Sequence, residues 1–271
     1  KQQLNTLKKR SLLGKLGTYG LMPKYGFPTE VVELKIRSSS RESGEIDLNR
    51  DMKLALSEFA PGNEIIAGGK VWTSQAIVLP SGDRKLHEFY YWHCEKCRFF
   101  SVENIVSDGS QSPPSKDCYC DEPQKARIYV YPEFGFSTSA SKGSGNVGDE
   151  RPSLKSYSEV FFHDDAAESE FIPIVGVPKI SYREAKQGWI HVINNNQDND
   201  FYICGSCGYA MGEHPKIVSP DHIRPWTSDQ RCSNSRLGKR GLGYRYRTDV
   251  VELRLPLDCL DRLGLHGSED F

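Results

Sequence analysis

The stretch Phe201-Tyr-Ile-Cys-Gly-Ser-Cys-Gly208 decides how this chain folds. It places a short apolar run directly before two cysteines that are separated by two residues, with a glycine after the second cysteine. A CxxC turn at the end of a strand brings two thiolates to one side, which is the geometry of a zinc knuckle. The glycine leaves the backbone free to turn sharply and expose the sulfur. The stretch therefore predicts a strand, Phe201 to Cys204, that ends in a structural metal site.

A second CxxC pair follows another strand-like run. The run 86–93 ends directly before Cys94-Glu-Lys-Cys97, and Cys118-Tyr-Cys120 lies downstream. Four thiolates complete a tetrahedron around zinc and leave no position for water, so such a site is structural rather than catalytic. The alternative is that the downstream pair are unrelated core cysteines, because CxC is less typical than CxxC. The expected ligands of this first site are Cys94, Cys97, Cys118 and Cys120.

The knuckle in the opening stretch needs two more ligands. Cys232 is the next cysteine, and the turn His222-Ile-Arg-Pro-Trp226 leads toward it. His214 and Cys259 are the other candidates for the fourth position. We prefer the histidine of the turn because of its direction along the chain. The expected ligands of the second site are Cys204, Cys207, His222 and Cys232, which gives two structural Zn²⁺ sites in all.

The composition is that of a folded intracellular protein. The chain has 271 residues, of which 37% are hydrophobic and 26% charged, and this argues against global disorder. Its formal net charge of -1 excludes a uniformly basic nucleic-acid binder but permits a local basic patch. No run is long enough to cross a bilayer, and the segment 1–10 lacks the apolar region of a signal peptide. We therefore expect a cytoplasmic location without membrane association, where eight cysteines favour metal over disulfides.

Short strand-like runs dominate the rest of the chain. Helices are expected only up to about residue 16 and over Asp47 to Phe59. The Ser/Gly-rich stretch 137–149 is expected to separate an N-terminal lobe, residues 1–140, from a C-terminal lobe, residues 141–271, each with one zinc site. The predicted class is α+β, a strand-rich two-lobe domain with two structural zinc knuckles. The expected strands are 31–36, 63–67, 71–79, 86–93, 158–162, 171–175, 188–194, 201–204 and 248–255.

The segment 231–247 is basic and contains no acidic residue. Guanidinium groups pair with phosphates and aromatic faces stack on bases, so the segment is a candidate nucleic-acid surface. The N-terminal segment up to Arg37 is similarly basic, with only Glu30 and Glu33 as acids. A solvated loop or a contact with an acidic protein would carry the same charges. The residues expected to contact DNA are Arg236, Lys239, Arg240, Tyr244, Arg245 and Arg247.

No catalytic motif is present in the sequence. It contains no GxxxxGK[ST], no GxGxxG after a strand, no HExxH and no GxSxG. The acidic run His163-Asp164-Asp165, with Glu168 and Glu170, is the nearest approach to a nuclease metal site. No lysine or second carboxylate pair accompanies it at motif spacing, so a solvated acidic loop explains it better. We therefore expect that this chain is not an enzyme by itself.

Five short phrases carry a family resemblance. In their order they resemble the cysteine-rich, helicase-associated zinc-binding domain found C-terminal to the motor in MrfA-type repair helicases. The same domain forms the B subunit, the helicase partner, of the DISARM anti-phage system. The phrases are Leu21-Met-Pro-Lys-Tyr-Gly-Phe-Pro28, Ser57-Glu-Phe-Ala-Pro-Gly62, Pro132-Glu-Phe-Gly-Phe136, Cys204-Gly-Ser-Cys-Gly208 and Leu242-Gly-Tyr-Arg-Tyr-Arg-Thr-Asp-Val250.

The resemblance implies a role in DNA processing. It implies a non-catalytic, zinc-containing accessory subunit or domain of a superfamily 2 helicase, which binds DNA and supports bacterial phage defence while the helicase hydrolyses ATP. It also supports His222 and Cys232 as ligands, since the family places a His-x-x-Pro turn and then a cysteine after CxxCG. The chain departs from the family at Tyr244, where relatives carry histidine. The alternatives are an adaptor that docks a helicase without contacting DNA, and the accessory domain of a DNA-repair helicase.

Overall fold

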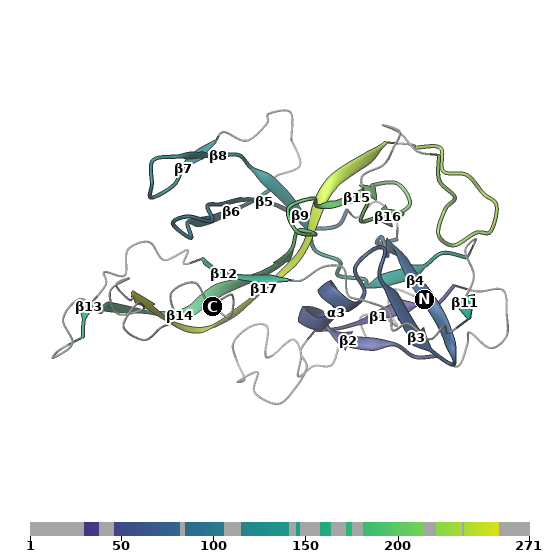
Figure 1. Cartoon of the computed structure of the whole chain (residues 1–271), viewed down its shortest axis with the longest axis horizontal. Coiled ribbons are helices and arrows are strands. Elements are labelled where there is room, and N and C mark those ends of the chain that lie inside the picture. Colours follow the sequence, from purple (N-terminus) through teal and green to yellow (C-terminus); the bar gives the residue numbers. More distant parts are fainter. Residues whose placement is uncertain are drawn as a thin grey trace.

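The structure is a computed structural model of the chain. It describes residues 30–37, 46–81, 85–105, 115–140, 145–146, 158–163, 172–174, 181–213, 221–234 and 236–254. Strands make up nearly all of the regular structure in these ranges (Figure 1), and the only helix there is α3, Met52–Glu58. The described part of the chain is therefore mostly β, and the α+β class predicted from the sequence is corrected. The helix predicted up to residue 16 lies outside the described residues.

The predicted helix over 47–59 is shorter because its first part is a strand. Asn49–Asp51 forms β2 and pairs antiparallel with β1, Val31–Lys35. The Asp51 carboxylate then accepts a hydrogen bond from the backbone N–H of Lys53 at 2.9 Å, which caps the helix where the strand ends. Pairing with β1 thus competes with helix formation for the first residues of the segment.

Two larger sheets and one hairpin organise the described strands. A six-stranded sheet has the order β11-β4-β10-β1-β2, with β3 paired to β4. A nine-stranded sheet has the order β12-β14-β17-β9-β5-β6, with β13 on β14 and β15 and β16 attached through β17. The hairpin joins β7 and β8. The bounds of the six-stranded sheet not yet given are β3 Glu64–Ala67, β4 Lys70–Ile77, β10 Phe136–Thr138 and β11 Gly145–Asn146.

The nine-stranded sheet is built around two long strands that run side by side across the molecule (Figure 1). These are β14, Ser181–Asn194, and β17, Leu237–Arg254. The other strands of this sheet are β5 Glu88–His93, β6 Phe100–Asn104, β9 Arg127–Val130, β12 Glu159–His163, β13 Ile172–Pro173, β15 Phe201–Cys204 and β16 Ala210–Met211, and the hairpin strands are β7 Lys116–Asp117 and β8 Pro123–Gln124.

Strand β14 is buried on both faces over its last residues. Successive strand side chains point to opposite faces, so Ile190 and Val192 enter one core while Ile193 enters the other. The first core also contains Leu56 of α3 and Phe136 of β10. This double burial explains why the run 189–194 has apolar residues at adjacent rather than alternate positions.

The predicted boundary near residue 140 does not divide the sheets. Strands β5, β6 and β9 precede it, yet they belong to the same sheet as β12, β14 and β17, which follow it. The parallel pairing of β9 with β17 joins Tyr129 to Gly241 and Val130 to Leu242. The larger core likewise takes residues from both sheets. Segments from the two halves of the sequence therefore share one framework. In the described part of the chain, no helix is long and apolar enough to cross a membrane.

A buried asparagine connects the helix to the nine-stranded sheet. Asn194 is fully buried, and its Nδ2 donates to the backbone carbonyl of Leu56 at 2.7 Å. Its Oδ1 accepts from the backbone N–H of Asn196 at 2.9 Å. The carbonyls of the last helical turn have no partner within the helix, so Leu56 depends on this side chain.

Replacing Asn194 by alanine should destabilise the fold by about 2 kcal/mol, because it leaves a buried carbonyl and an amide unsatisfied. The measurement is the midpoint of chemical or thermal unfolding. Asn199→Ala is the matched control, since Asn199 is exposed in the same loop region and should change stability by less than about 0.5 kcal/mol. Equal effects of the two substitutions would contradict the bridging role of Asn194.

Candidate metal centres and basic cleft

The first cysteine pair lies in the turn between β5 and β6. His93 and Phe100 are the last paired residues of this antiparallel hairpin, so the strands deliver Cys94 and Cys97 to its tip. The backbone N–H of Cys94 donates to the carbonyl of Phe99 at 3.0 Å and closes the turn. The hairpin therefore holds both thiols on one rigid loop, as the sequence predicted.

The partner cysteines lie in the turn of the β7–β8 hairpin. The backbone N–H of Cys118 donates to the carbonyl of Glu122 at 3.2 Å, and that of Asp121 donates to the carbonyl of Cys118 at 3.0 Å. An ion pair between Lys96 and Glu122, at 2.5 Å, connects this turn to the first one. Two hairpin tips thus face each other and present their sulfurs to a common point.

The ligand atoms of the first cluster all lie within 4.8 Å of one another. The Cys94 and Cys120 sulfurs are 3.6 Å apart, and those of Cys118 and Cys120 are 3.0 Å apart. Zinc–sulfur bonds of about 2.3 Å place tetrahedral neighbours roughly 3.8 Å apart, so the spacing suits a tetrahedral ion. Burial raises the pKa of Cys118, but hydrogen bonds from the Cys120 thiol and from backbone N–H groups outweigh it and lower that pKa to about 6. The Cys118 sulfur thus favours the thiolate, which is the form that binds metal, while the same hydrogen bond raises the pKa of Cys120.

The second knuckle connects β15 to β16. The backbone N–H of Cys204 donates to the carbonyl of Tyr209 at 2.8 Å, and that of Gly208 donates back to Cys204 at 2.8 Å. Gly208 has φ +75, and a Cβ there would lie 2.1 Å from the carbonyl oxygen of Ile77. Only glycine fits this position, because the knuckle packs directly against the end of β4.

The remaining two donors come from a second turn. The backbone N–H of Cys232 donates to the carbonyl of His222 at 2.9 Å, and Ile223 forms a bridge with Arg231. The His222 ring is buried and stacks on Tyr209, with ring centroids 4.7 Å apart. These contacts fix the imidazole against the first knuckle and aim its Nε2 at the cysteine sulfurs.

The donor atoms of the second cluster also lie within 4.8 Å of one another. The Cys204 and Cys232 sulfurs are 3.8 Å apart, and His222 Nε2 is 3.2 Å from the Cys207 sulfur. Hydrogen bonds from the Cys207 thiol and from backbone N–H groups lower the pKa of Cys204 to about 4, against the opposing effect of burial. The structure thus brings together the four residues predicted for this site.

The two donor sets are consistent with two metal sites. One offers four sulfurs and the other three sulfurs and an imidazole nitrogen, which are the donor sets of structural zinc. Soft thiolate ligands select zinc over magnesium or calcium, whose ligands are oxygens. Of the competing candidates for the second site, His214 and Cys259 lie outside the described residues.

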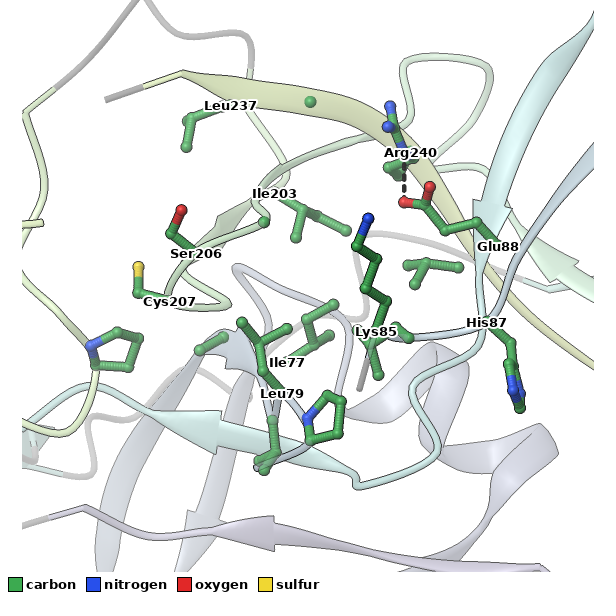
Figure 2. Close-up of a pocket in the computed structure, with 18 of the residues that line it drawn as sticks. Ile77, Leu79, Lys85, His87, Glu88, Ile203, Ser206, Cys207, Leu237 and Arg240 are labelled. Carbon is green, nitrogen blue, oxygen red and sulfur yellow. Dashed lines mark hydrogen bonds and ion pairs between the residues drawn. The ribbon is translucent and has the colours of Figure 1, made fainter. Parts of the chain in front are cut away.

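A cleft of about 1710 Å³ lies between the second knuckle, the end of β4, the segment leading into β5 and the start of β17. In Figure 2 Lys85 extends into this cleft, and Ile77, Leu79 and Ile203 lie on one side of it in this view. Glu88 is the single carboxylate among the described residues of the lining, and it accepts a hydrogen bond from Arg240 Nε at 2.9 Å. The cationic side chains of the lining are Arg37, Lys85, Arg236, Lys239, Arg240 and Arg245.

The cleft collects four of the six residues predicted to contact DNA: Arg236, Lys239, Arg240 and Arg245. Arg245 also stacks on Trp189, 4.3 Å from the ring centroid, and on Phe89, at 4.7 Å. Arg247 is exposed and stacks on Trp189, but it is not among the described residues of the lining.

Tyr244 does not belong to this surface. It is 7% exposed and packs in the larger core, because alternation along β17 turns it away from Arg245. Lys85 and Trp226 also line the cleft, although the sequence did not predict them. Neither has a local signal, because Lys85 is far from the basic segment and Trp226 lies in a turn between metal donors.

The described part of the chain is a strand-rich protein with two sulfur-rich metal-ligand clusters, the second of which borders a basic cleft. No family model matches the chain, and no solved structure matches it. Among curated proteins it is similar to the Druantia protein DruE of Escherichia coli (strain UMEA 4076-1). The two are 23% identical over 272 residues, which cover 91% of this chain and 14% of that protein. The chain thus spans about a seventh of the length of its curated relative.

Elemental analysis of the purified chain should give two zinc ions per molecule. Cys97→Ser and Cys207→Ser should each reduce the content to one, because each removes a donor from a different cluster. Cys259→Ser is the control and should keep both ions, since both described clusters already have four donors. A content of one in the unsubstituted chain would contradict one of the two sites.

Gly208→Ala should destabilise the fold by about 3 kcal/mol, because the new Cβ would overlap the Ile77 carbonyl at a positive φ. Thermal unfolding of the zinc-loaded protein measures this. Gly205→Ala, in the same knuckle, meets nothing within 4 Å and should be close to neutral. If both alanines are tolerated equally, the knuckle does not pack on β4 as described.

Proposed function

We propose that this chain binds DNA through the basic cleft and acts as a non-catalytic accessory unit of a superfamily 2 helicase in bacterial anti-phage defence. The observation that carries the proposal is the charge of the cleft lining, with six cations and a single carboxylate in its described part. A concave surface with walls of low dielectric concentrates the field of such charges. Phosphates are the ligands that this arrangement favours.

Two of these cations are the best placed to meet phosphates. Arg236 and Lys239 are exposed at the start of β17, and Lys239 has Asp200 at 3.9 Å as a distant partner. Arg240, by contrast, is engaged by Glu88, and Arg245 is stacked between aromatic rings. We therefore assign Arg236 and Lys239 the largest share of phosphate binding, with Arg240 and Arg245 holding the cleft in shape.

The defence role rests on the distant similarity to DruE, a protein of the Druantia anti-phage defence system. That protein is much longer than this chain, so the matched region is a small part of it. We propose that a helicase motor, on the same or a separate polypeptide, supplies ATP hydrolysis. A DNA-repair helicase and the DISARM system remain the alternative settings implied by the family resemblance.

The proposed absence of catalysis follows from the number of donors. Each cluster already provides four ligands, so an ion bound there has no open position for water or substrate. The metals would instead hold the hairpin tips and the cleft wall in place. We also propose a cytoplasmic location, because a reducing compartment keeps such thiols available for metal.

An adaptor that docks a helicase without contacting DNA is the second candidate. Its supporting observation is the apolar surface at the far end of β14 and β17. Ile172, Tyr182 and Leu253 lie opposite one another in adjacent strands there, and Ile172 and Leu253 are more than half exposed. Apolar groups that gather on an exposed sheet face are typical of protein contacts.

Charge reversal of Arg236 and Lys239 should weaken DNA binding on the order of tenfold or more and reduce the slope of log affinity against log salt by about two. Fluorescence anisotropy with a labelled oligonucleotide at several salt concentrations measures both quantities. Lys53→Glu with Lys186→Glu is the matched control: both lysines are exposed and away from the cleft, and the net charge changes equally.

Identical losses in both double variants would show that only overall charge matters and would reject the cleft. If the unsubstituted chain retains a helicase but binds no DNA at any salt concentration, the adaptor replaces the DNA-binding proposal.

A further inference from the structure

An exposed tryptophan lines the basic cleft. Trp226 is 44% exposed, although aromatic side chains of this size are usually buried in a core. It lies in the turn that runs from His222 to Cys232, the two late donors of the second metal cluster. The cleft thus contains a large aromatic side chain together with its cations.

The backbone around Trp226 is held on both sides. The carbonyl of Pro225 accepts a hydrogen bond from the backbone N–H of Ala140 at 2.9 Å, which anchors the turn next to β10. The backbone N–H of Thr227 donates to the carbonyl of Arg224 at 3.0 Å. The backbone that carries the indole is therefore preorganised, so that ligand binding has to order only the side chain itself.

The size and shape of the cleft favour an extended polymer over a small molecule or a duplex. Its volume, about 1710 Å³, exceeds the roughly 300–1,000 Å³ of pockets that hold one small molecule. Proteins read duplex DNA by inserting a helix or a β-ribbon into a groove, which requires a protruding element. The cationic residues here lie instead in a concave site, which suits a strand that enters the protein.

The cationic residues of the cleft match the phosphates of a nucleotide chain, and its aromatic and apolar residues match the bases. Cations such as Arg236 and Lys239 suit the phosphates, while the indole of Trp226 and the partly exposed side chain of Leu79 suit unstacked bases. Bases inside a duplex are stacked on each other and cannot offer a face to an indole. A single strand exposes both parts at once.

We propose that the cleft is selective for single-stranded nucleic acid, with an unpaired base stacked on Trp226 and the backbone phosphates on the cations at the start of β17. This proposal rests on the proposed DNA-binding function and specifies its substrate. The second metal cluster positions the stacking residue, because its two late donors lie on either side of Trp226 in the same turn.

The experiment compares binding of the unsubstituted zinc-loaded chain to a labelled 20-nucleotide single strand and to the duplex of the same sequence. We expect the single strand to bind at least tenfold more tightly at moderate salt. Trp226→Ala should weaken single-strand binding on the order of tenfold, the loss expected for one base stack. It should leave the salt slope unchanged, since no phosphate contact is removed.

Two further variants separate stacking from folding. Trp226→Phe keeps an aromatic face and should retain most of the affinity. Tyr119→Ala removes an aromatic side chain that is 74% exposed in the other metal cluster, outside the cleft lining, and should have no effect. Zinc content and thermal unfolding of each variant report on its fold.

Equal affinity for duplex and single strand would overturn the inference and leave the DNA-binding function standing. Unchanged affinity in a folded Trp226→Ala variant would overturn the stacking role. If Trp226→Ala does not fold, the comparison of the two DNA forms still tests the selectivity for single strands. The Trp226→Phe variant then tests the stacking role. Failure to bind either form would instead reject the proposed function itself.

Discussion

Four donors have to meet at one point in the second metal cluster, and this requirement organises the centre of the molecule. The knuckle after β15 and the turn from His222 to Cys232 are far apart in sequence, and a shared ion would pull them together. Gly208 then accepts a hydrogen bond from the backbone N–H of Ile77 at 2.9 Å, which links the knuckle to the six-stranded sheet. Neighbouring residues of the knuckle and the turn, among them Cys207 and Trp226, form one wall of the basic cleft. Two metal donors and one wall of the cleft therefore share a single turn.

The nine-stranded sheet provides a second constraint, because it fixes where the basic residues of β17 lie. Strand β17 pairs with β15 at its start and with β14 over most of its length, so its basic first residues lie beside the knuckle. Alternation along the strand separates its side chains by role. Leu242 and Tyr244 fill the core, whereas Arg245 stands on the other face against Trp189 and Phe89. The basic segment 231–247 looks uniform in the sequence. In the structure some of its side chains line the cleft and others pack in the core beneath it.

Local patterns predicted the CxxC knuckles and the strands that lead into them. These turns and strands formed where the sequence placed them, because each depends on a few neighbouring residues. Strands β6, β9 and β10 were not predicted, and β17 was predicted only from residue 248 onward. The α+β class was wrong, since pairing with β1 took the residues that begin the predicted helix. The boundary near residue 140 followed composition alone. Composition has no information about the parallel pairing of β9 with β17, which crosses that point.

The sequence by itself determined the chemistry of the metal clusters: which thiols form pairs, and that a histidine and a third cysteine should complete the second set. Spacing is sufficient for the cysteine pairs, because a knuckle is a local turn, whereas the preference for His222 rests on the direction of its turn and on the family resemblance. Only the tertiary structure decided what surrounds the clusters. Lys85, Trp226 and Arg236 come from three distant segments, and they line one cleft because two sheets and a knuckle bring those segments together. Such proximity depends on non-local strand pairing, which leaves no mark in any single stretch of the chain.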